Sequence, residues 1–327
     1  MIESVGIIGG GAWGTALALV AARAGRRTTL FARNPATVAA INQRRENPAY
    51  LPGVTLDAPV AGTSDLGEAL AADAVFLAVP AQTVRAVVGS FGAAARPGTR
   101  LVIAAKGLER GTGKRLTAIV AELAPGLVPA VLSGPSFAGD VARRLPTAVT
   151  IAAADGAVAT ELCVSLGGPS FRPYAETDVV GVEIGGGVKN VLAIAAGIVA
   201  GRKLGSSALA ALVARGFAEL RRLAEALGAR PETLMGLSGL GDLVLTCSGP
   251  QSRNFSYGMA LGEGHPVSSL HPLAEGVATA GVARDLARNY GIEMPITEAV
   301  ADVLAGTLTI EAAIDRLMSR PLRREAN

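Results

Sequence analysis

Short apolar runs alternate with amphipathic stretches over the first half of the chain. Continuous apolar runs at 74–79 and 101–105 are typical of strands that are buried on both faces of a sheet. Helical patterns follow them at about 83–93 and 113–123. Further strands are expected at 4–9, 27–32, 128–132, 147–152 and 170–174. Strands alternating with helices predict an α/β fold with a Rossmann-type, doubly wound and mainly parallel sheet.

The pattern changes from about residue 178, where strand signals fade. Two glycine-rich stretches, GLSGLGD at 236–242 and TCSGPQSRN at 246–254, are expected to be loops. We expect a first domain over 1–180 and an all-α second domain over 181–327. Ala- and Leu-rich segments predict the helices of this second domain at 188–200, 207–227, 274–290 and 296–305.

Composition narrows the class of protein. Half of the 327 residues are hydrophobic and only 17% are charged, as in globular chains with a large core. The net charge of +3 suits a small anionic ligand, and the basic run RPLRR at 320–324 is interpreted as a solvated tail, so no nucleic-acid partner is expected. Cys163 and Cys247 are far apart and lack metal-ligand spacing, so we expect no metal site and a reducing, cytoplasmic location.

One uncharged stretch, at 4–22, is nearly long enough to span a membrane. Glu3 precedes it, no basic segment introduces it, and glycines and Thr15 interrupt it. We therefore expect neither a signal peptide nor membrane insertion.

A glycine motif follows the first predicted strand and opens a predicted helix. Gly9, Gly11 and Gly14 have the GxGxxG spacing of dinucleotide-binding loops. Gly9 would permit the tight turn, Gly11 would let a pyrophosphate approach the backbone, and Gly14 would let the helix pack on the sheet. Trp13 would either cover the cofactor or fill the core. The alternative is a strand–helix turn without a ligand.

The acidic residue that usually binds the cofactor ribose in NAD enzymes is missing. Between Glu3 and Glu46 the chain has no Asp or Glu, and the second predicted strand leads into Arg33. A guanidinium matches a 2′-phosphate in charge and geometry. The sequence therefore predicts a preference for NADP(H), with NAD(H) as a second cofactor; the alternative is a surface arginine.

Lys189 follows three consecutive glycines, Gly185 to Gly187, in an otherwise apolar segment. If a helix begins here, Gly185 and Gly186 lie one turn before Lys189 on the same face. We expect that glycine face to leave room for a ligand beneath the ammonium group. The alternative is a lysine that extends from a helix end into solvent.

Other polar residues gather at predicted strand ends and loops. Lys106 follows a buried strand, where ligands bind in open α/β sheets. Ser133, Gly134 and Ser136 follow another strand and form a candidate anion-binding turn. For each cluster the alternative is an ordinary loop or helix cap. Further candidates in the second domain are Asp242, Ser252, Arg253 and Asn254.

These motifs occur in a familiar order. The segments GGGAWGTALA, FARN, NPAYLPG, AVPAQTV, AAKGLE, SGPSFAGD, VEIGGGVKNVLAIAAG, GLSGLGDLVLTC and QSRN together resemble those of the bacterial NAD(P)-dependent glycerol-3-phosphate dehydrogenases. The resemblance covers nearly the whole chain. It implies that residues 1–180 bind a dinucleotide, that 181–327 form a helical substrate domain, and that the enzyme interconverts dihydroxyacetone phosphate and sn-glycerol 3-phosphate for phospholipid synthesis.

The resemblance also implies roles for individual residues. Lys189 would be the catalytic proton donor and acceptor at the C2 oxygen, and it would also contact the substrate. The other implied substrate contacts are Lys106, Gly134, Ser136, Asp242, Ser252, Arg253 and Asn254. The implied cofactor contacts are Gly9, Gly11, Ala12, Trp13, Gly14, Arg33, Asn34, Tyr50, Lys106, Ala138, Arg253, Leu273 and Glu275.

Lys189 needs a lowered pKa for this role, because a free lysine titrates too high for acid–base work at neutral pH. We expect burial and the like charge of Lys106 to lower it and Asp242 to orient the ammonium group. The chain departs from the family pattern at 187–188, 206–214 and 273–274. Two other functions remain, an NADP(H)-dependent reductase of a hydroxy or keto acid and a non-catalytic NADP(H) sensor. The apolar helices favour a homodimer.

Overall fold

The computed structural model describes residues 1–92, 95–267 and 274–321. In this part of the chain one eight-stranded sheet has the order β3-β2-β1-β4-β5-β6-β7-β8. All neighbouring strands are parallel except β6 and β7, which are antiparallel. The mainly parallel, doubly wound sheet predicted from the sequence is therefore confirmed. Its strands are β1 (Ser4–Ile8), β2 (Arg27–Phe31), β3 (Ala61–Thr63), β4 (Ala74–Leu77), β5 (Arg100–Ile103), β6 (Val128–Ser133), β7 (Thr147–Ala153) and β8 (Phe171–Glu176).

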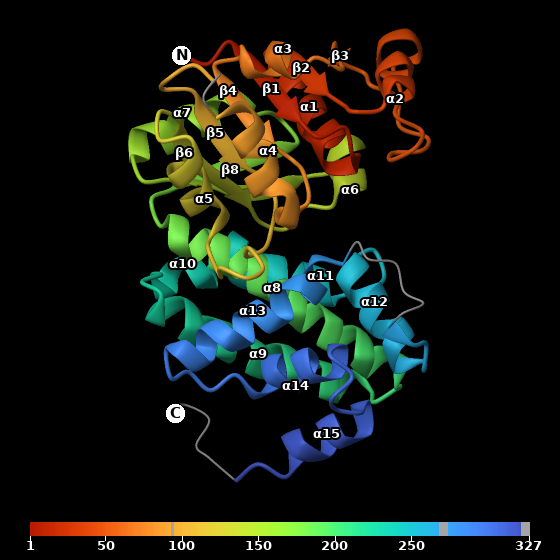
Figure 1. The fold of residues 1–327 in the computed structure, drawn as a ribbon. Helices are drawn as coiled ribbons and strands as arrows, with labels where there is room; N and C mark the ends of the chain where they lie inside the picture. The colour runs from red at the N-terminus through yellow and green to blue at the C-terminus, as the bar shows by residue number, and fades with distance from the viewer. Residues whose placement is uncertain (93–94, 268–273, 322–327) are drawn as a thin grey trace.

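Helices cover both faces of the sheet (Figure 1). Two apolar cores result, one that includes residues of α1 and α7 and one that includes residues of α3, α4 and α5. The central strand β4 is fully buried, which is why its sequence is a continuous apolar run. The helices around the sheet are α1 (Ala12–Arg23), α2 (Pro35–Ala39), η1 (Ala40–Arg44), α3 (Leu66–Leu70), η2 (Ala81–Thr83), α4 (Val84–Phe91), α5 (Leu116–Leu123), α6 (Ala138–Ala142) and α7 (Gly156–Leu166).

The described residues after β8 are helical, as expected for the second half. Helix α8 runs through the middle of this half, α9 to α14 pack around it, and α15 packs on α14 (Figure 1). Its length and composition resemble a membrane span, but 83% of its most apolar window is buried inside the protein. The helices are α8 (Val179–Gly201), α9 (Ser206–Ala226), α10 (Pro231–Met235), η3 (Leu237–Gly241), α11 (Asp242–Cys247), α12 (Arg253–Gly262), α13 (Glu275–Asn289), α14 (Pro295–Leu304) and α15 (Ile310–Met318).

Helix α8 begins nine residues before the expected start at 188. Asp178 caps it, since one carboxylate oxygen accepts a 2.8 Å hydrogen bond from the Gly181 amide. The other oxygen accepts a 2.7 Å bond from the Arg230 amide, just before α10. The expectation that the glycine triplet marks a helix start is therefore wrong. The helix begins at the Asp178 cap and includes the triplet, so Lys189 lies in the interior of α8.

The glycine-rich stretch at 236–242 is also helical from Leu237 onward rather than a loop. Residues Leu237–Gly241 form a π-helix that continues directly into α11. A Cβ atom on Gly239 would overlap the backbone of Leu234, so only glycine allows this tight packing. The π-helix ends at Gly241, and Asp242 is the first residue of α11.

One contact between the two halves of the chain is made by Glu183, near the start of α8. Glu183 is buried, and its carboxylate accepts hydrogen bonds of 2.9 Å from the Thr117 amide and 2.5 Å from the Thr117 hydroxyl. It also pairs with Arg115 at 3.0 Å. These bonds cap the first turn of α5, so they attach the core helix of one half to the sheet layer of the other.

Candidate active site

The glycine loop between β1 and α1 combines packed and open positions. Gly9 has a φ of 124°, and a Cβ atom there would overlap the Ala78 carbonyl oxygen. A Cβ on Gly14 would overlap the Gly9 carbonyl oxygen. By contrast, a Cβ on Gly11 would meet no described atom within 4 Å. Packing therefore explains Gly9 and Gly14, whereas the space beside Gly11, at the uncapped start of α1, is free for a ligand.

Asn47, from the NPAYLPG segment, holds this loop and was missed by our sequence reasoning. Its side chain is fully buried, and Nδ2 donates to the Gly10 carbonyl at 2.9 Å and to Thr15 Oγ1 at 2.8 Å. Trp13 packs partly against the core, and its buried Nε1 has no hydrogen-bond partner among the described residues. An unpartnered buried donor in this loop is a feature that a bound ligand can satisfy.

The other predicted cofactor residues near β2 are exposed. Arg33 lies two residues beyond the end of β2, on the surface. Asn34 caps α2 by accepting a 2.9 Å hydrogen bond from the Ala36 amide, and Tyr50 is 53% exposed. Among these three, the structure thus gives Asn34 a local structural role. Ala12 and Ala138 pack against the same core as Trp13.

Lys189, Asp242 and Lys106 form one buried charge cluster. Asp242 Oδ1 lies 2.9 Å from Lys189 Nζ, and Asp242 Oδ2 lies 2.7 Å from Lys106 Nζ. The Lys189 side chain is 5% exposed and that of Lys106 is 15% exposed. The carboxylate thus holds two ammonium groups brought from the interior of α8 and from the loop after β5. The predicted proximity of these three residues is found.

Two further groups complete the surroundings of the cluster. Lys189 Nζ donates a 2.5 Å hydrogen bond to Thr246 Oγ1, whose own proton goes to the Asp242 carbonyl at 2.6 Å. Lys106 Nζ donates to the Gly134 carbonyl at 2.9 Å. Thr246 was not among the predicted residues. Its position four residues after Asp242, on the same face of α11, is the sequence signal that would have identified it.

The cluster shifts the pKa of Lys189 in the expected direction. The pKa of Lys189 is lowered to about 8 in total: burial is the largest cause, the attraction of Asp242 opposes it, and the like charge of Lys106 adds to it. The pKa of Asp242 is lowered by both lysines in spite of its burial. Lys189 can therefore exchange a proton near neutral pH while Asp242 stays ionised, which is the requirement for a lysine acid–base catalyst.

The glycine triplet does not leave the open face that we expected. A Cβ on Gly185 would lie 2.9 Å from the Ser238 carbonyl oxygen, and one on Gly187 would lie 3.3 Å from the Gly107 Cα. A Cβ on Gly186 would overlap Ser133 Oγ. The triplet is packed against protein on all three residues: Gly185 and Gly187 let neighbouring backbones approach α8 closely, and Gly186 makes room for the Ser133 side chain.

Of the remaining predicted substrate residues, Ser136 and Asn254 are connected to the cluster by hydrogen bonds. Ser136 Oγ donates to the Gly134 carbonyl at 3.0 Å. Ser252 caps α12 with a 3.3 Å hydrogen bond from the Phe255 amide, and Arg253, the first residue of α12, is exposed. Asn254 Nδ2 donates at 3.0 Å to Asn190 Oδ1, and Asn190, a residue we did not predict, is itself buried.

The last two predicted cofactor residues are near the start of α13. Glu275 begins this helix and accepts a 3.2 Å hydrogen bond from the Ala81 amide, which belongs to the sheet half. Leu273 lies outside the described residues. Glu275 thus bridges the two halves on the same side as the loop that carries Lys106, since Gly107 packs against Ala81.

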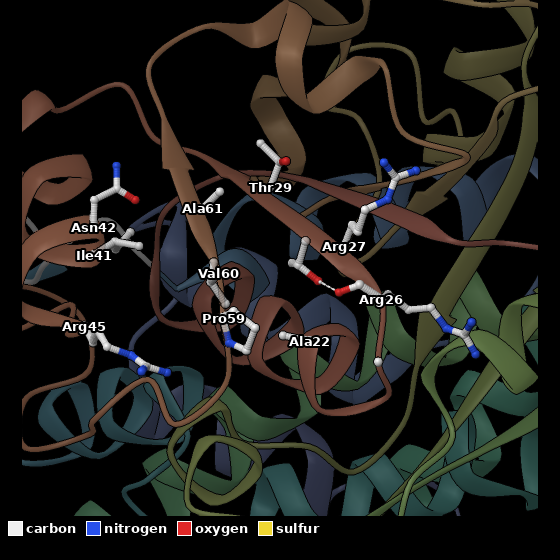
Figure 2. Close-up of a pocket in the computed structure, with 12 residues that line it drawn as sticks. Ala22, Arg26, Arg27, Thr29, Ile41, Asn42, Arg45, Pro59, Val60 and Ala61 are labelled. Atoms are coloured by element: carbon white, nitrogen blue, oxygen red, sulfur yellow. Dashed lines mark hydrogen bonds between the residues drawn. The ribbon is translucent and has the colours of Figure 1, made fainter.

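Two cavities lie in different places. One is lined by Phe137, Leu245 and residues 248–251. The other lies between the end of α1, η1 and the start of β2, with Arg26 and Arg27 on one side and Asn42 and Arg45 on the other (Figure 2). None of the predicted site residues lines this second cavity.

Comparisons with known proteins agree with the geometry. A family model described as the N-terminus of NAD-dependent glycerol-3-phosphate dehydrogenase matches residues 4–159, and its C-terminal counterpart matches residues 178–315. The chain belongs to the NAD-dependent glycerol-3-phosphate dehydrogenase family. The resemblance seen in the sequence is confirmed.

Similar proteins named glycerol-3-phosphate dehydrogenase match this chain over nearly their whole length. The glycerol-3-phosphate dehydrogenase (NAD(P)+) of Bradyrhizobium sp. (strain BTAi1) is 59% identical over 99% of this chain and 98% of its own. That of Caulobacter vibrioides is 53% identical over 99% of both chains. The crystal structure of glycerol-3-phosphate dehydrogenase from Coxiella burnetii has a TM-score of 0.91 at 38% identity, covering 98% of this chain and 99% of that one.

A ketopantoate reductase from Ralstonia eutropha shares the fold alone. Its TM-score is 0.61 at 17% identity, over 93% of this chain and 98% of its own. This likeness is much weaker than that to the glycerol-3-phosphate dehydrogenases, and it does not favour the keto-acid alternative.

Proposed function

We propose that this enzyme reduces dihydroxyacetone phosphate reversibly to sn-glycerol 3-phosphate, the backbone of phospholipids, and that Lys189 gives the proton to the C2 oxygen. The observation that carries the assignment of Lys189 is its buried ammonium group, held by Asp242 and Thr246 where the two halves of the chain meet. Family membership supports the reaction itself.

The glycine loop fits a dinucleotide. The unfilled space at Gly11, the uncapped start of α1 and the unpartnered Trp13 Nε1 are all features that such a ligand would use. When bound, NADP(H) supplies the hydride for the C2 carbon, and NAD(H) serves as a second cofactor. We propose that Arg33 binds the 2′-phosphate, which its exposed position beyond β2 and the absence of acidic residues between Glu3 and Glu46 support.

Lys189 is the proposed donor of the proton that the C2 oxygen receives during reduction. In the reducing direction charge develops on the C2 oxygen, and a protonated Lys189 neutralises it. Thr246 can only accept from Lys189, because its own proton is donated to the Asp242 carbonyl. Asp242 and Thr246 therefore fix two of the three N–H directions of the ammonium group, and the third is left for the substrate.

Substrate binding uses the cations near this cluster. Lys106 is less buried than Lys189 and shares Asp242 with it, so it lies beside any substrate that reaches Lys189. We propose that Arg253, at the exposed start of α12, binds the substrate phosphate together with the turn at Gly134 and Ser136. Binding the phosphate remotely would position the C2 carbon for reaction.

The experiment that tests the reaction compares two substrates that differ only in the phosphate. NADPH oxidation is measured with dihydroxyacetone phosphate and with unphosphorylated dihydroxyacetone. We expect kcat/KM to be at least about 1000-fold higher for the phosphate ester, since charge-assisted phosphate contacts each contribute about 1.5–3 kcal/mol. Equal rates on the two substrates, or faster turnover of a 2-keto acid, would contradict the proposal.

The same assay with NADH tests the part assigned to Arg33. Replacing Arg33 by alanine is expected to lower the ratio of NADPH to NADH efficiency without changing the substrate preference. Arg27, an exposed arginine at the other end of β2, provides the matched control, because Arg27→Ala should leave the cofactor ratio unchanged.

We also propose that the enzyme is a homodimer in the cytoplasm. The apolar helices of the second half support the homodimer, and two of them, α10 and α11, expose Met235 and Val244. Both cysteines are free thiols, as in a reducing compartment. Sedimentation equilibrium of the purified chain would measure the oligomeric state.

A further inference from the structure

Two buried side chains, those of Asn47 and Thr15, hold two carbonyl groups of the glycine loop between β1 and α1. Asn47 Nδ2 donates hydrogen bonds of 2.9 Å to the Gly10 carbonyl and 2.8 Å to Thr15 Oγ1. Thr15 Oγ1 donates in turn at 2.9 Å to the Gly11 carbonyl, which also accepts from the Thr15 amide at 3.0 Å. Both residues are completely buried. We call Asn47 and Thr15 the loop-holding pair.

The Gly10 carbonyl fixes the orientation of the Asn47 side chain. A carbonyl can only accept, so it faces Nδ2, which then uses both of its protons, on Gly10 and on Thr15. The Asn47 Oδ1 atom points the other way and is buried without a hydrogen-bond partner among the described residues. An unpaired buried acceptor lowers stability, so stability of the fold alone does not explain an asparagine at this position.

Each held carbonyl sets the direction of the amide that follows it. In a trans peptide the C=O of one residue and the N–H of the next point in opposite directions, and no described peptide bond is cis. Asn47 therefore directs the Gly11 amide away from itself, and Thr15 does the same for the Ala12 amide. These amides stand at the start of α1, where N–H groups lack acceptors within the helix and no side chain caps them.

The glycines of this loop do not hold these directions by themselves. Gly10 and Gly11 adjoin the same peptide bond, and glycine adopts positive and negative φ at similar cost. A Cβ atom on Gly11 would meet no described atom within 4 Å, so packing at Gly11 does not prevent the peptide plane from reversing. A reversed plane would present a carbonyl oxygen, which carries partial negative charge, where an anion needs an N–H group.

Asn47 also connects the glycine loop to the turn that contains Tyr50, another predicted cofactor contact. The Asn47 carbonyl accepts hydrogen bonds of 3.1 Å from the Tyr50 amide and 2.8 Å from the Leu51 amide. The side chain of Asn47 thus holds one predicted cofactor segment, and its backbone holds the other.

We propose that Asn47 and Thr15 are positioning residues that orient the Gly11 and Ala12 amides for the pyrophosphate of the cofactor. The inference rests on the proposed function, because it takes the glycine loop as the cofactor site. The loop-holding pair acts through the backbone and contacts no reacting atom. Its effect should therefore appear in cofactor affinity and not in the chemical step.

Two substitutions of Thr15 separate this role from packing. Thr15→Val keeps the buried volume and removes the hydroxyl; Gly10 keeps its bond from Asn47 and Gly11 keeps its bond from the amide, so the unfolding midpoint should stay near that of the wild type. Thr15→Ser keeps the hydroxyl and removes a buried methyl group, so the midpoint should fall by a few degrees. The dissociation constant of NADPH, measured by fluorescence, should show the opposite order: a rise of about fivefold in Thr15→Val and a change within about twofold in Thr15→Ser.

Asn47→Leu removes the donor and keeps a branched side chain of similar size. We expect the dissociation constants of NADPH and NADH each to rise on the order of tenfold, because both cofactors carry the same pyrophosphate. The ratio of the two constants should not change, unlike in Arg33→Ala. In steady-state assays KM for NADPH should rise while kcat at saturating NADPH stays near that of the wild type, because Lys189 lies in the other half of the protein.

Two matched controls make the same changes away from the glycine loop. Thr160 Oγ1 donates at 2.8 Å to the Gly156 carbonyl, also four residues earlier and at the start of a helix, so Thr160→Val removes the same kind of bond as Thr15→Val. The Asn42 side chain makes two 2.8 Å hydrogen bonds to the Gly62 backbone, which Asn42→Leu removes. Both variants should bind NADPH as the wild type does.

Three results would overturn the proposal. The first is wild-type NADPH affinity in both Asn47→Leu and Thr15→Val. The second is an affinity that follows the unfolding midpoint, with Thr15→Ser weaker than Thr15→Val, since that order indicates packing alone. The third is an equal loss of affinity in the controls. If Asn47→Leu does not fold, the two Thr15 variants still decide. A wild type that binds NADPH without reducing dihydroxyacetone phosphate would instead overturn the proposed function, and the dissociation constants would still report on the loop-holding pair.

Discussion

Two glycine-rich segments, the loop before α1 and the triplet inside α8, look alike in the sequence and differ in the structure. In the loop, a Cβ on Gly11 would meet no described atom within 4 Å, whereas every glycine of the triplet has a neighbouring protein atom within that distance. The first segment leaves space for a ligand at Gly11. The second is packed against protein throughout: Gly186 and Gly187 face the sheet half, and Gly185 faces Ser238 of the helical half. Glycine alone therefore does not indicate a binding site; the decisive observation is what would occupy the place of its missing side chain.

The two segments also serve different steps, since one is suited to cofactor binding and the other precedes the proposed proton donor. The glycine loop belongs to the sheet half and is suited to a dinucleotide. The triplet lies directly before Lys189 and fixes the helix that carries the proposed acid–base group. Changes at the two segments should therefore affect different measured quantities, and the predictions below start from the largest expected effect.

Lys189→Ala should cause the largest loss. We expect kcat to fall by about 10³-fold, since general acid–base groups typically contribute 10²- to 10⁴-fold. NADPH affinity should stay near that of the wild type, because the glycine loop is in the other half. Stopped-flow oxidation of NADPH and fluorescence titration measure the two quantities.

Lys114 provides the control for this substitution. It is exposed and pairs with Glu122 on the surface, so Lys114→Ala should retain full turnover. Lys189→Met, which preserves apolar volume in the buried site, separates loss of the ammonium group from loss of packing. If Lys189→Met keeps kcat within a few fold of the wild type, Lys189 is not the proton donor.

Two glycine-to-alanine variants test the comparison directly. Gly185→Ala should destabilise the fold by about 1–3 kcal/mol, because the new methyl group would press on the Ser238 carbonyl. Gly11→Ala should leave the unfolding midpoint unchanged or slightly raised, because it meets no atom and has a φ of −79° that alanine adopts freely. Its NADPH affinity should instead fall by about tenfold or more, since a methyl group would stand where the pyrophosphate approaches.

The unfolding midpoint and the NADPH dissociation constant are measured for Gly185→Ala, Gly11→Ala and the wild type. The comparison fails if Gly11→Ala loses stability, or if Gly185→Ala weakens NADPH binding while the fold stays as stable as the wild type.

Much of the sheet half could be predicted from the sequence, because parallel strands buried on both faces leave continuous apolar runs. The runs at 74–79 and 101–105 are such strands in the structure, as β4 and β5. The glycine loop was found for a similar reason, since local backbone requirements appear directly as residue types. Lys106, Asp242 and Lys189 were also identified, and the structure brings them together.

The helical half was harder to predict because tertiary contacts override local preference there. Glycine disfavours helix by about 1 kcal/mol relative to alanine, so the triplet looked like a helix start. In the structure the close approach of Ser238 and Gly107 compensates, and Asp178 caps a helix that begins at Val179, nine residues before the expected start. The same reasoning explains why the stretch at 236–242 was taken for a loop.

Asn190 was missed for another reason. It lies in an apolar helix directly after Lys189, and the sequence analysis assigned the function of this segment to the lysine alone. The available signal was the spacing of polar and small residues at 183, 187 and 190, which places Glu183, Gly187 and Asn190 on one face of α8. That face contacts the sheet half at Thr117, Gly107 and Lys106.

The smallest expected effect is a shift in the pH dependence, and it distinguishes the two charges that flank Lys189. Reduction needs the protonated lysine, so kcat/KM for dihydroxyacetone phosphate should fall as pH rises through about 8, the pKa of Lys189. Oxidation of glycerol 3-phosphate needs the neutral lysine, so its rate should rise over the same range. Asp242 raises this pKa and Lys106 lowers it.

Replacing Asp242 and replacing Lys106 should therefore shift the pH dependence of kcat/KM in opposite directions. Asp242→Asn should shift the limb to lower pH, because the neutral amide no longer stabilises the ammonium charge. Lys106→Met should shift it to higher pH, because the like charge is gone while the apolar stem remains. The measurement is the residual kcat/KM between pH 6 and pH 10 in both reaction directions. Shifts in the same direction for both variants would mean that the limb reports a group other than Lys189, and the chemistry would then have to be assigned elsewhere in the cluster.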